Sequence, residues 1–132
     1  MALEDGVLSL TLNRPDSLNS LTAAMLRTLA DALEQAAGDP RVRVVRLGGA
    51  GRGFCSGAGI SAEDQARRSG DPAADDVLAQ ANRSVRAITA LPKPVVAVVQ
   101  GPAAGVGVSL ALACDVVVAS EKAFFLLAFT KI

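Results

Sequence analysis

The chain has 132 residues, with 13 basic and 13 acidic side chains, no histidine, two cysteines and, as its only aromatic residues, four phenylalanines. This length suits one domain with a single core, and the balanced charge and scarce aromatic rings exclude a basic or base-stacking surface for nucleic acid. The lack of histidine excludes Ser-His-Asp and Cys-His catalysis within these residues and argues against a zinc site, so we expect no metal.

The first predicted element is a half-buried strand over Val7–Leu12, where apolar and polar residues alternate. Asn19 or Ser20 can cap the helix that follows, whose apolar residues recur along one face until a Gly-Asp-Pro sequence ends it. Val42–Leu47 is predicted to form the second strand. The densest glycine segment of the chain, residues 48–59, comes directly after it.

Residues 61–76 are polar and include a Gly-Asp-Pro turn, which predicts an irregular and mobile surface segment. Apolar spacing predicts a helix over Val77–Ala90. The continuous apolar run Val95–Val99 predicts a strand that is covered on both faces, as in a sheet flanked by helices. Two further strands are predicted over Val116–Ala119 and Ala123–Ala128. This succession of strands and helices predicts the α/β class.

The stretch Gly101–Asp115 joins a glycine-rich turn to a short helix of small and apolar residues, which predicts a helix buried on all sides. Gly105 and Gly107 at its start cost helix propensity, roughly 1 kcal/mol each relative to alanine. Two interpretations of these glycines stay open. They allow close packing of helix and sheet, or they leave free N–H groups at the helix start that bind negative charge.

Two glycine loops follow predicted strands, and neither has the spacing of a nucleotide-binding fingerprint. Exposed backbone N–H groups beside small residues are expected at Ser56-Gly57-Ala58 and at Gly105-Val106-Gly107. If these N–H groups converge, they form an oxyanion hole, which stabilises charge that develops on a carbonyl oxygen. Cys55 lies in the first loop without a histidine to activate it, so we interpret it as a packed thiol rather than a nucleophile.

The most apolar run of the chain, residues 124–129, lies three residues before its last residue. Such a run can dock into the core as a terminal strand, or it can mark a domain that continues beyond Ile132. We expect the second, because a complete domain rarely ends by presenting an uncovered apolar segment.

Several motifs together resemble the enoyl-CoA hydratase/isomerase (crotonase) family, and they cover nearly the whole chain in unbroken order. They are Asn13-Arg14-Pro15, Leu18-Asn19-Ser20-Leu21, residues 39–45, residues 51–57, and residues 93–97 leading into 101–115. The resemblance implies a spiral of β-β-α repeats, of which residues 1–132 would form a partial acyl-CoA-binding core domain, because members are about twice as long. It also implies an acyl-CoA thioester substrate, a role in fatty acid metabolism, no cofactor beyond the coenzyme A of the substrate, and assembly as a homotrimer or hexamer.

The resemblance places the oxyanion hole on the backbone N–H groups of Ala58 and Val106. Enolate charge on a thioester oxygen can be held by such donors without a titratable group. The substrate-binding residues that the resemblance implies lie beside the thioester or the coenzyme A arm, and they are Ser17, Leu18, Ala58, Gly59, Ile60 and Gly105.

The acid–base residues depart from the family pattern. Hydratases use two glutamates to add water, and the matching positions here hold Ser109 and Phe129. Ser109 is a weak catalytic candidate that could position a water, and Phe129 cannot transfer a proton. Gly59 also replaces an aspartate that is common after the oxyanion loop. Isomerase-type members take their single acid from further along the chain, beyond Ile132 here.

Three hypotheses follow. The leading one is an acyl-CoA enzyme, a hydratase or a Δ3,Δ2-enoyl-CoA isomerase, and the residue pattern leans toward the isomerase. The alternatives are a non-catalytic acyl-CoA-binding protein and a purely structural subunit. The chain has no signal peptide and no apolar run long enough to span a bilayer, so no membrane partner is expected. Two free thiols favour a cytoplasmic location.

Overall fold

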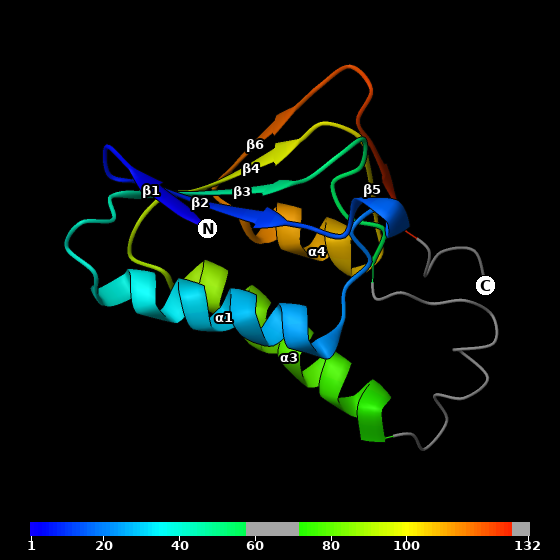
Figure 1. The fold of residues 1–132 in the computed structure, drawn as a ribbon, viewed down its shortest axis with the longest axis horizontal. Helices are drawn as coiled ribbons and strands as arrows, with labels where there is room; N and C mark the ends of the chain where they lie inside the picture. Colours follow the sequence, from blue (N-terminus) through cyan, green and yellow to red (C-terminus); the bar gives the residue numbers. More distant parts are fainter. Residues whose placement is uncertain (58–71, 128–132) are drawn as a thin grey trace.

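A computed structural model describes residues 1–57 and 72–127. Its main sheet has five strands in the order β1-β2-β3-β4-β6, in which β1 is antiparallel to β2 and the other neighbours are parallel. These strands are β1 (Ala2–Glu4), β2 (Val7–Leu12), β3 (Val44–Gly49), β4 (Val95–Val99) and β6 (Val116–Ala119). The helices that lie along one face of this sheet (Figure 1) are α1 (Ala23–Gly38), α3 (Pro72–Ala90) and α4 (Val106–Ala113). The predicted α/β class is confirmed.

The strand predicted over Val7–Leu12 is confirmed with those bounds as β2. Its leucines, Leu8, Leu10 and Leu12, are buried on the helix-facing side, as the alternation predicts. Leu10 pairs in register with Leu47 of β3. Parallel pairing therefore places the buried side chains of β2 and β3 side by side on the face of the sheet that faces the helices. These side chains and those of the helices form the core.

The second strand begins and ends two residues later than predicted, as β3 (Val44–Gly49). The N–H groups of Arg43 and Val44 both donate to the carbonyl of Gly6, which marks the point where the chain enters the sheet. At the other end, two glycines extend the strand by pairing with β2. Backbone ladders need no side chain, so the hydrophobic pattern did not indicate this extension.

The predicted cap of the first helix is wrong. Thr22 is the N-cap of α1, and its Oγ1 accepts a hydrogen bond from the N–H of Met25 at 3.1 Å. Asn19 is instead fully buried, with a left-handed backbone at φ 58°, and its amide binds a loop far along the chain. Residues 15–17 form a short 3-10 helix that precedes this turn.

The helix predicted over Val77–Ala90 is longer than expected, because α3 begins at Pro72 rather than at residue 77. Proline suits the first turn of a helix, where its missing N–H has no intrahelical partner. The prediction of an irregular segment is therefore wrong for residues 72–76, and residues 58–71 lie outside the described residues. Arg83 on α3 pairs with Asp31 and Glu34 of α1, which links the two helices at the surface.

Two predictions of complete burial are wrong. Val96 and Val98 of β4 are partly exposed, because the described helices cover only the other face of the sheet. In α4, Leu112 is 67% exposed and Ser109 is also exposed. A helix that is apolar all round carries no signal for which side faces solvent.

Two short strands that lie apart from the main sheet complete the fold. They are β5 (Pro102–Ala104) and β7 (Phe124–Leu126), which pair in parallel. The sequence predicted a strand over Ala123–Ala128 and gave no indication of β5. The strand β6 (Val116–Ala119) is confirmed as predicted, and it lies at the edge of the described sheet.

Candidate functional site

Three segments that are distant in sequence meet beyond the ends of β3 and β4. They are residues 17–21, the first glycine loop at residues 49–57, and the second glycine loop at residues 100–107. Two hydrogen bonds join residues 17–21 to the first glycine loop. The N–H of Ser56 donates to the carbonyl of Leu18 at 2.8 Å, and the N–H of Leu21 donates to the carbonyl of Gly57 at 2.7 Å. The sequence predicted both glycine loops, and the structure shows that they are neighbours.

Backbone hydrogen bonds also join the two glycine loops to each other. The N–H groups of Phe54 and Cys55 donate to the carbonyl of Pro102 at 3.0 and 3.2 Å, and the N–H of Ala104 donates to the carbonyl of Cys55 at 2.9 Å. Cys55 and Ala103 form an isolated parallel bridge. The first loop therefore continues as an extra strand-like segment along β5.

The start of α4 packs directly on the first loop. A Cβ added at Gly107 would lie 2.6 Å from the carbonyl oxygen of Cys55, and one added at Gly57 would lie 3.8 Å from the nitrogen of Val106. Gly105, the N-cap of α4, has φ 54°, a conformation that glycine adopts without strain. Both interpretations of these glycines are thus compatible: they allow close packing, and they bring Val106 beside Gly57.

Val106 is the first residue of α4, where backbone N–H groups have no intrahelical acceptor. Neighbouring N–H groups are engaged, since Gly105 donates to the carbonyl of Leu126 and Val108 to that of Gly105. No residue in the described part of the chain accepts a hydrogen bond from the N–H of Val106. This donor, at the positive end of a helix, is suited to an oxygen that carries negative charge.

The remaining predicted substrate-binding residues divide into two groups. Ser17 and Leu18 adjoin the first loop, because the hydroxyl of Ser56 donates to the carbonyl of Ser17 at 2.9 Å. Leu18 has a left-handed backbone, with φ 53°, at the end of the short 3-10 helix. Residues 58–60, predicted as Ala58, Gly59 and Ile60, lie outside the described residues, so the second oxyanion donor and part of the coenzyme A site stay predictions.

Two side-chain amides hold the first loop, and sequence reasoning missed both. The Nδ2 of Asn19 lies 2.9, 3.0 and 3.2 Å from the carbonyl oxygens of Ala50, Gly53 and Phe54. The Nε2 of Gln100 lies within 3.0 Å of three carbonyl oxygens of the same loop. Asn19 belonged to a recognised motif but was interpreted as a possible cap, and no pattern in the sequence indicated a role for Gln100.

Cys55 behaves as a packed thiol. Its side chain is fully buried, and burial raises the pKa of the thiol to about 11 despite a hydrogen bond from the N–H of Gly57. A thiol protonated at neutral pH is a poor nucleophile. These observations support the interpretation made from the sequence.

The candidate acid–base residues are placed less favourably. Ser109 lies on the exposed side of α4, one turn after Val106, and its hydroxyl has no hydrogen-bond partner among the described residues. Asp115 has a structural role, because its Oδ2 accepts a hydrogen bond from the N–H of Val95 at 2.8 Å. Phe129 lies outside the described residues.

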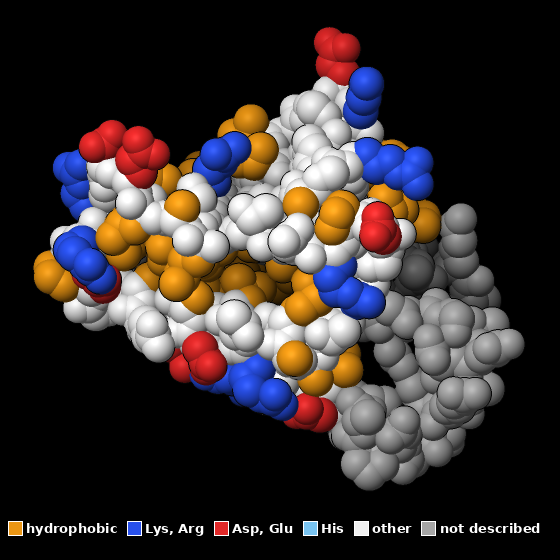
Figure 2. Space-filling view, in the orientation of Figure 1, with side chains coloured by type: hydrophobic (Ala, Val, Ile, Leu, Met, Phe, Trp, Pro, Cys, Tyr) orange, Lys and Arg blue, Asp and Glu red, His pale blue; other side chains and the backbone are white. Residues whose placement is uncertain are grey.

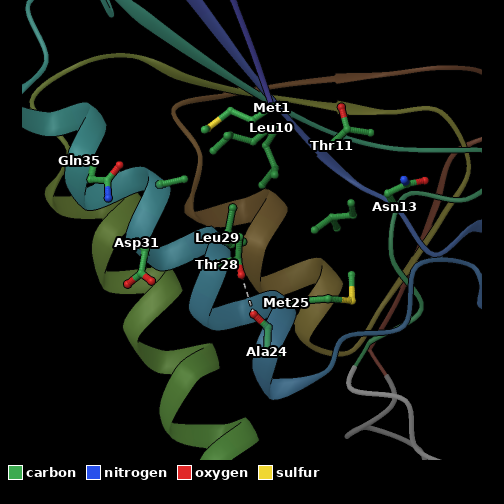
Figure 3. Close-up of a pocket in the computed structure, with 13 residues that line it drawn as sticks. Met1, Leu10, Thr11, Asn13, Ala24, Met25, Thr28, Leu29, Asp31 and Gln35 are labelled. Carbon is green, nitrogen blue, oxygen red and sulfur yellow. Dashed lines mark hydrogen bonds between the residues drawn. The ribbon is translucent and has the colours of Figure 1, made fainter.

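A separate hollow lies between the sheet and α1. It has a volume of about 550 Å³, and Figure 2 shows apolar side chains on its floor. Side chains of β2 and α1 line it, including Leu10, Met25 and Leu29, with Met1 at its edge (Figure 3). None of its described lining residues belongs to the predicted substrate-binding set.

Two other kinds of feature are absent from the part of the chain that the structure describes. Across residues 1–57 and 72–127, cysteine and acidic side chains form no group of three that could hold a metal ion. Among the described helices, none has the length and the apolar character that a membrane span requires.

Comparison with known proteins identifies relatives of the whole chain. The family model described as enoyl-CoA hydratase/isomerase matches residues 2–132. A 1,2-epoxyphenylacetyl-CoA isomerase from Escherichia coli K12 is 44% identical over 98% of this chain and 50% of its own length. A probable enoyl-CoA hydratase from Rhodobacter capsulatus is 40% identical over 98% of this chain and 49% of its own length.

Solved structures agree with these relatives. An enoyl-CoA hydratase from Mycobacterium avium subsp. paratuberculosis K-10 superposes with a TM-score of 0.87 at 66% identity, covering 99% of this chain and 50% of that one. A monofunctional enoyl-CoA isomerase from M. smegmatis gives a TM-score of 0.75 at 37% identity, covering 92% of this chain and 49% of that one. The chain thus spans about half the length of the relatives that it matches.

Proposed function

Because the chain belongs to the enoyl-CoA hydratase/isomerase family, we propose that it binds an acyl-CoA thioester and stabilises the enolate of that thioester in a backbone oxyanion hole. The chain shares the fold of these structural relatives, and within it the chain's two glycine loops lie against each other. The observation that carries the proposal is the N–H of Val106, which has no acceptor among the described residues and lies against the first loop at Gly57.

The proposed chemistry follows from the position of this donor. Removing a proton beside a thioester carbonyl moves negative charge onto the carbonyl oxygen. Val106 supplies one N–H at the positive end of α4, and Ala58 supplies the second from the end of the first loop. Donors that are fixed before the reaction stabilise the enolate more than the neutral thioester, and this difference lowers the barrier.

The substrate would lie between the two loops and residues 17–18. In the proposal, Ser17, Leu18, Gly59 and Ile60 contact the coenzyme A arm, and Gly105 leaves room beside the thioester. Hydrogen bonds between Ser56 and residues 17–18 support this arrangement, because they hold the proposed coenzyme A segment against the donor loop. No cofactor beyond the substrate's own coenzyme A is required.

Proton transfer is the part of the reaction that this chain supports least. Ser109 is uncharged, and a hydroxyl is a poor general base without a partner. We therefore propose enolate stabilisation in an isomerase-type or hydratase-type reaction of fatty acid metabolism, with the acid–base group supplied outside the described residues. Assembly as a homotrimer or hexamer in the cytoplasm is proposed by analogy with the family.

A second candidate is an acyl-CoA-binding protein without catalysis, and Ser109 in place of a glutamate is the observation that favours it. The two functions differ in one measurable step. An enzyme exchanges the α-protons of butyryl-CoA with D₂O, whereas a binding protein leaves them in place. Nuclear magnetic resonance of the bound thioester follows this exchange directly.

The decisive experiment removes a single N–H. Proline is tolerated at the first position of a helix, so Val106→Pro deletes the donor with little effect on α4, and Val106→Ala is the matched control that keeps the N–H. Acetoacetyl-CoA is the probe, because its enolate is followed by ultraviolet absorbance. We expect Val106→Pro to lower enolate binding by about 10²–10³-fold relative to Val106→Ala. Equal enolate binding by the two variants would remove the oxyanion proposal.

A further inference from the structure

Gln100 connects the two glycine loops through its side chain. Its Nε2 lies 2.6 Å from the carbonyl oxygen of Gly49, 2.9 Å from that of Gly51 and 3.0 Å from that of Gly53. An amide has two hydrogens, so these three acceptors share them. The glycine loop therefore turns alternate carbonyls toward one side chain of a different segment.

The attachment point of Gln100 is itself fixed. Its own carbonyl accepts a hydrogen bond from the hydroxyl of Ser120 at 2.8 Å, and it directly follows the buried end of β4 at Val99. After Gln100 the chain runs through β5 to the start of α4. A displacement of the first loop would therefore also move the segment that carries Val106.

The contacts of Gln100 begin a continuous seam between the loops. Beyond the amide, the carbonyl of Pro102 accepts the N–H groups of Phe54 and Cys55, and the carbonyl of Cys55 lies under Gly107. The seam ends where Gly57 faces Val106. The amide is the only part of this seam among the described residues that a side-chain substitution can remove without altering the backbone.

We infer that Gln100 is a positioning residue, which holds the first glycine loop in register with α4 and so keeps Gly57 beside the N–H of Val106. This role rests on the proposed function. Asn19 binds the same loop from residues 17–21, and its Nδ2 also lies 3.0 Å from the carbonyl of Gly53. Gln100 is the better test, because it is only partly buried whereas Asn19 is completely buried.

The test compares Gln100→Met, which keeps the length of the side chain and removes the donors, with Gln35→Met as the matched control. Gln35 is exposed on α1 and makes no hydrogen bond with any described residue. Two ligands are titrated against each protein: acetoacetyl-CoA, followed as its enolate, and coenzyme A, which lacks the acyl carbonyl. A displacement of about 1 Å at a reacting centre can cost 10²-fold, so we expect enolate binding to fall by about 10- to 100-fold in Gln100→Met.

Binding of coenzyme A is expected to stay at the level of the wild type, and Gln35→Met is expected to match the wild type with both ligands. Equal losses for both ligands, or no loss for either, would overturn the positioning role. If Gln100→Met does not fold, Gln100→Asn, whose shorter amide cannot reach the same carbonyls, decides between these results. A wild-type chain that does not prefer acetoacetyl-CoA to coenzyme A overturns the proposed function itself, and the positioning role with it.

Discussion

The contact between Gly107 and Cys55 gives a prediction that can be worked out from the structure. In Gly107→Ala, the new Cβ would lie 2.6 Å from the carbonyl oxygen of Cys55, 0.8 Å closer than the 3.4 Å at which ordinary van der Waals contact begins. The same Cβ would lie 2.8 Å from the Cβ of Cys55. Both contacts are with buried parts of the first loop, so α4 and the loop must move apart.

Two opposing terms set the magnitude. Alanine gains roughly 1 kcal/mol of helix propensity over glycine, and overpacking a buried site costs about 1–3 kcal/mol. At a contact this short we take the upper part of that range and expect a net loss of about 1–2 kcal/mol in the free energy of unfolding. The separation also displaces Val106 from the first loop, so enolate binding is expected to fall by about 10- to 100-fold.

Gly38→Ala is the matched control, because Gly38 is also a helical glycine and an added Cβ there meets no atom within 4 Å. Its substitution should raise the free energy of unfolding by about 0.5–1 kcal/mol. Urea unfolding is followed by circular dichroism, since the chain has no tryptophan or tyrosine. The reasoning is refuted if both variants are stabilised alike, because the close approach of the loops would then impose no packing cost.

The remaining predictions concern a helix end and the two thiols. The ammonium group of Lys93 donates to the carbonyls of Ala36 and Asp39 at 2.6 and 2.7 Å, at the C-terminal end of α1. In Lys93→Met, urea unfolding should therefore show a free energy of unfolding that is lower by about 1.5–3 kcal/mol. An equal loss in the exposed control Lys122→Met would contradict this. Both cysteines are buried, and burial raises the pKa of each thiol from 9.0 to about 11. The unfolded thiols ionise at lower pH than the folded ones, so the free energy of unfolding should fall as the pH rises from about 9 toward 11. Iodoacetamide should label Cys55 at pH 8 only after unfolding, and rapid labelling of the folded chain would contradict the burial of this thiol.

Local patterns predicted the elements whose burial follows a simple period. The alternation in Val7–Leu12 matches β2, and the apolar run Val95–Val99 matches β4 with the predicted bounds. Errors occurred where a long-range partner decides the outcome. Thr22 rather than Asn19 caps α1, because the Oδ1 of Asn19, the atom that a cap would use, accepts the N–H of Arg14 at 2.7 Å, and its Nδ2 donates to carbonyls more than 30 residues away. The strand β5 exists because residues 102–104 find β7 as a partner.

The sequence by itself determined the α/β class, the resemblance to a family that the comparisons then established, and the two glycine loops that carry the candidate donors. Glycine content and the turn-to-helix transition are local properties, so they can be found along the chain. Only the tertiary structure decided that the loops touch, with Gly107 over Cys55 and Gly57 beside Val106. It also revealed the role of Gln100. Nothing in the sequence distinguishes this glutamine from others, because its role depends on the three distant carbonyls that the fold brings to its amide.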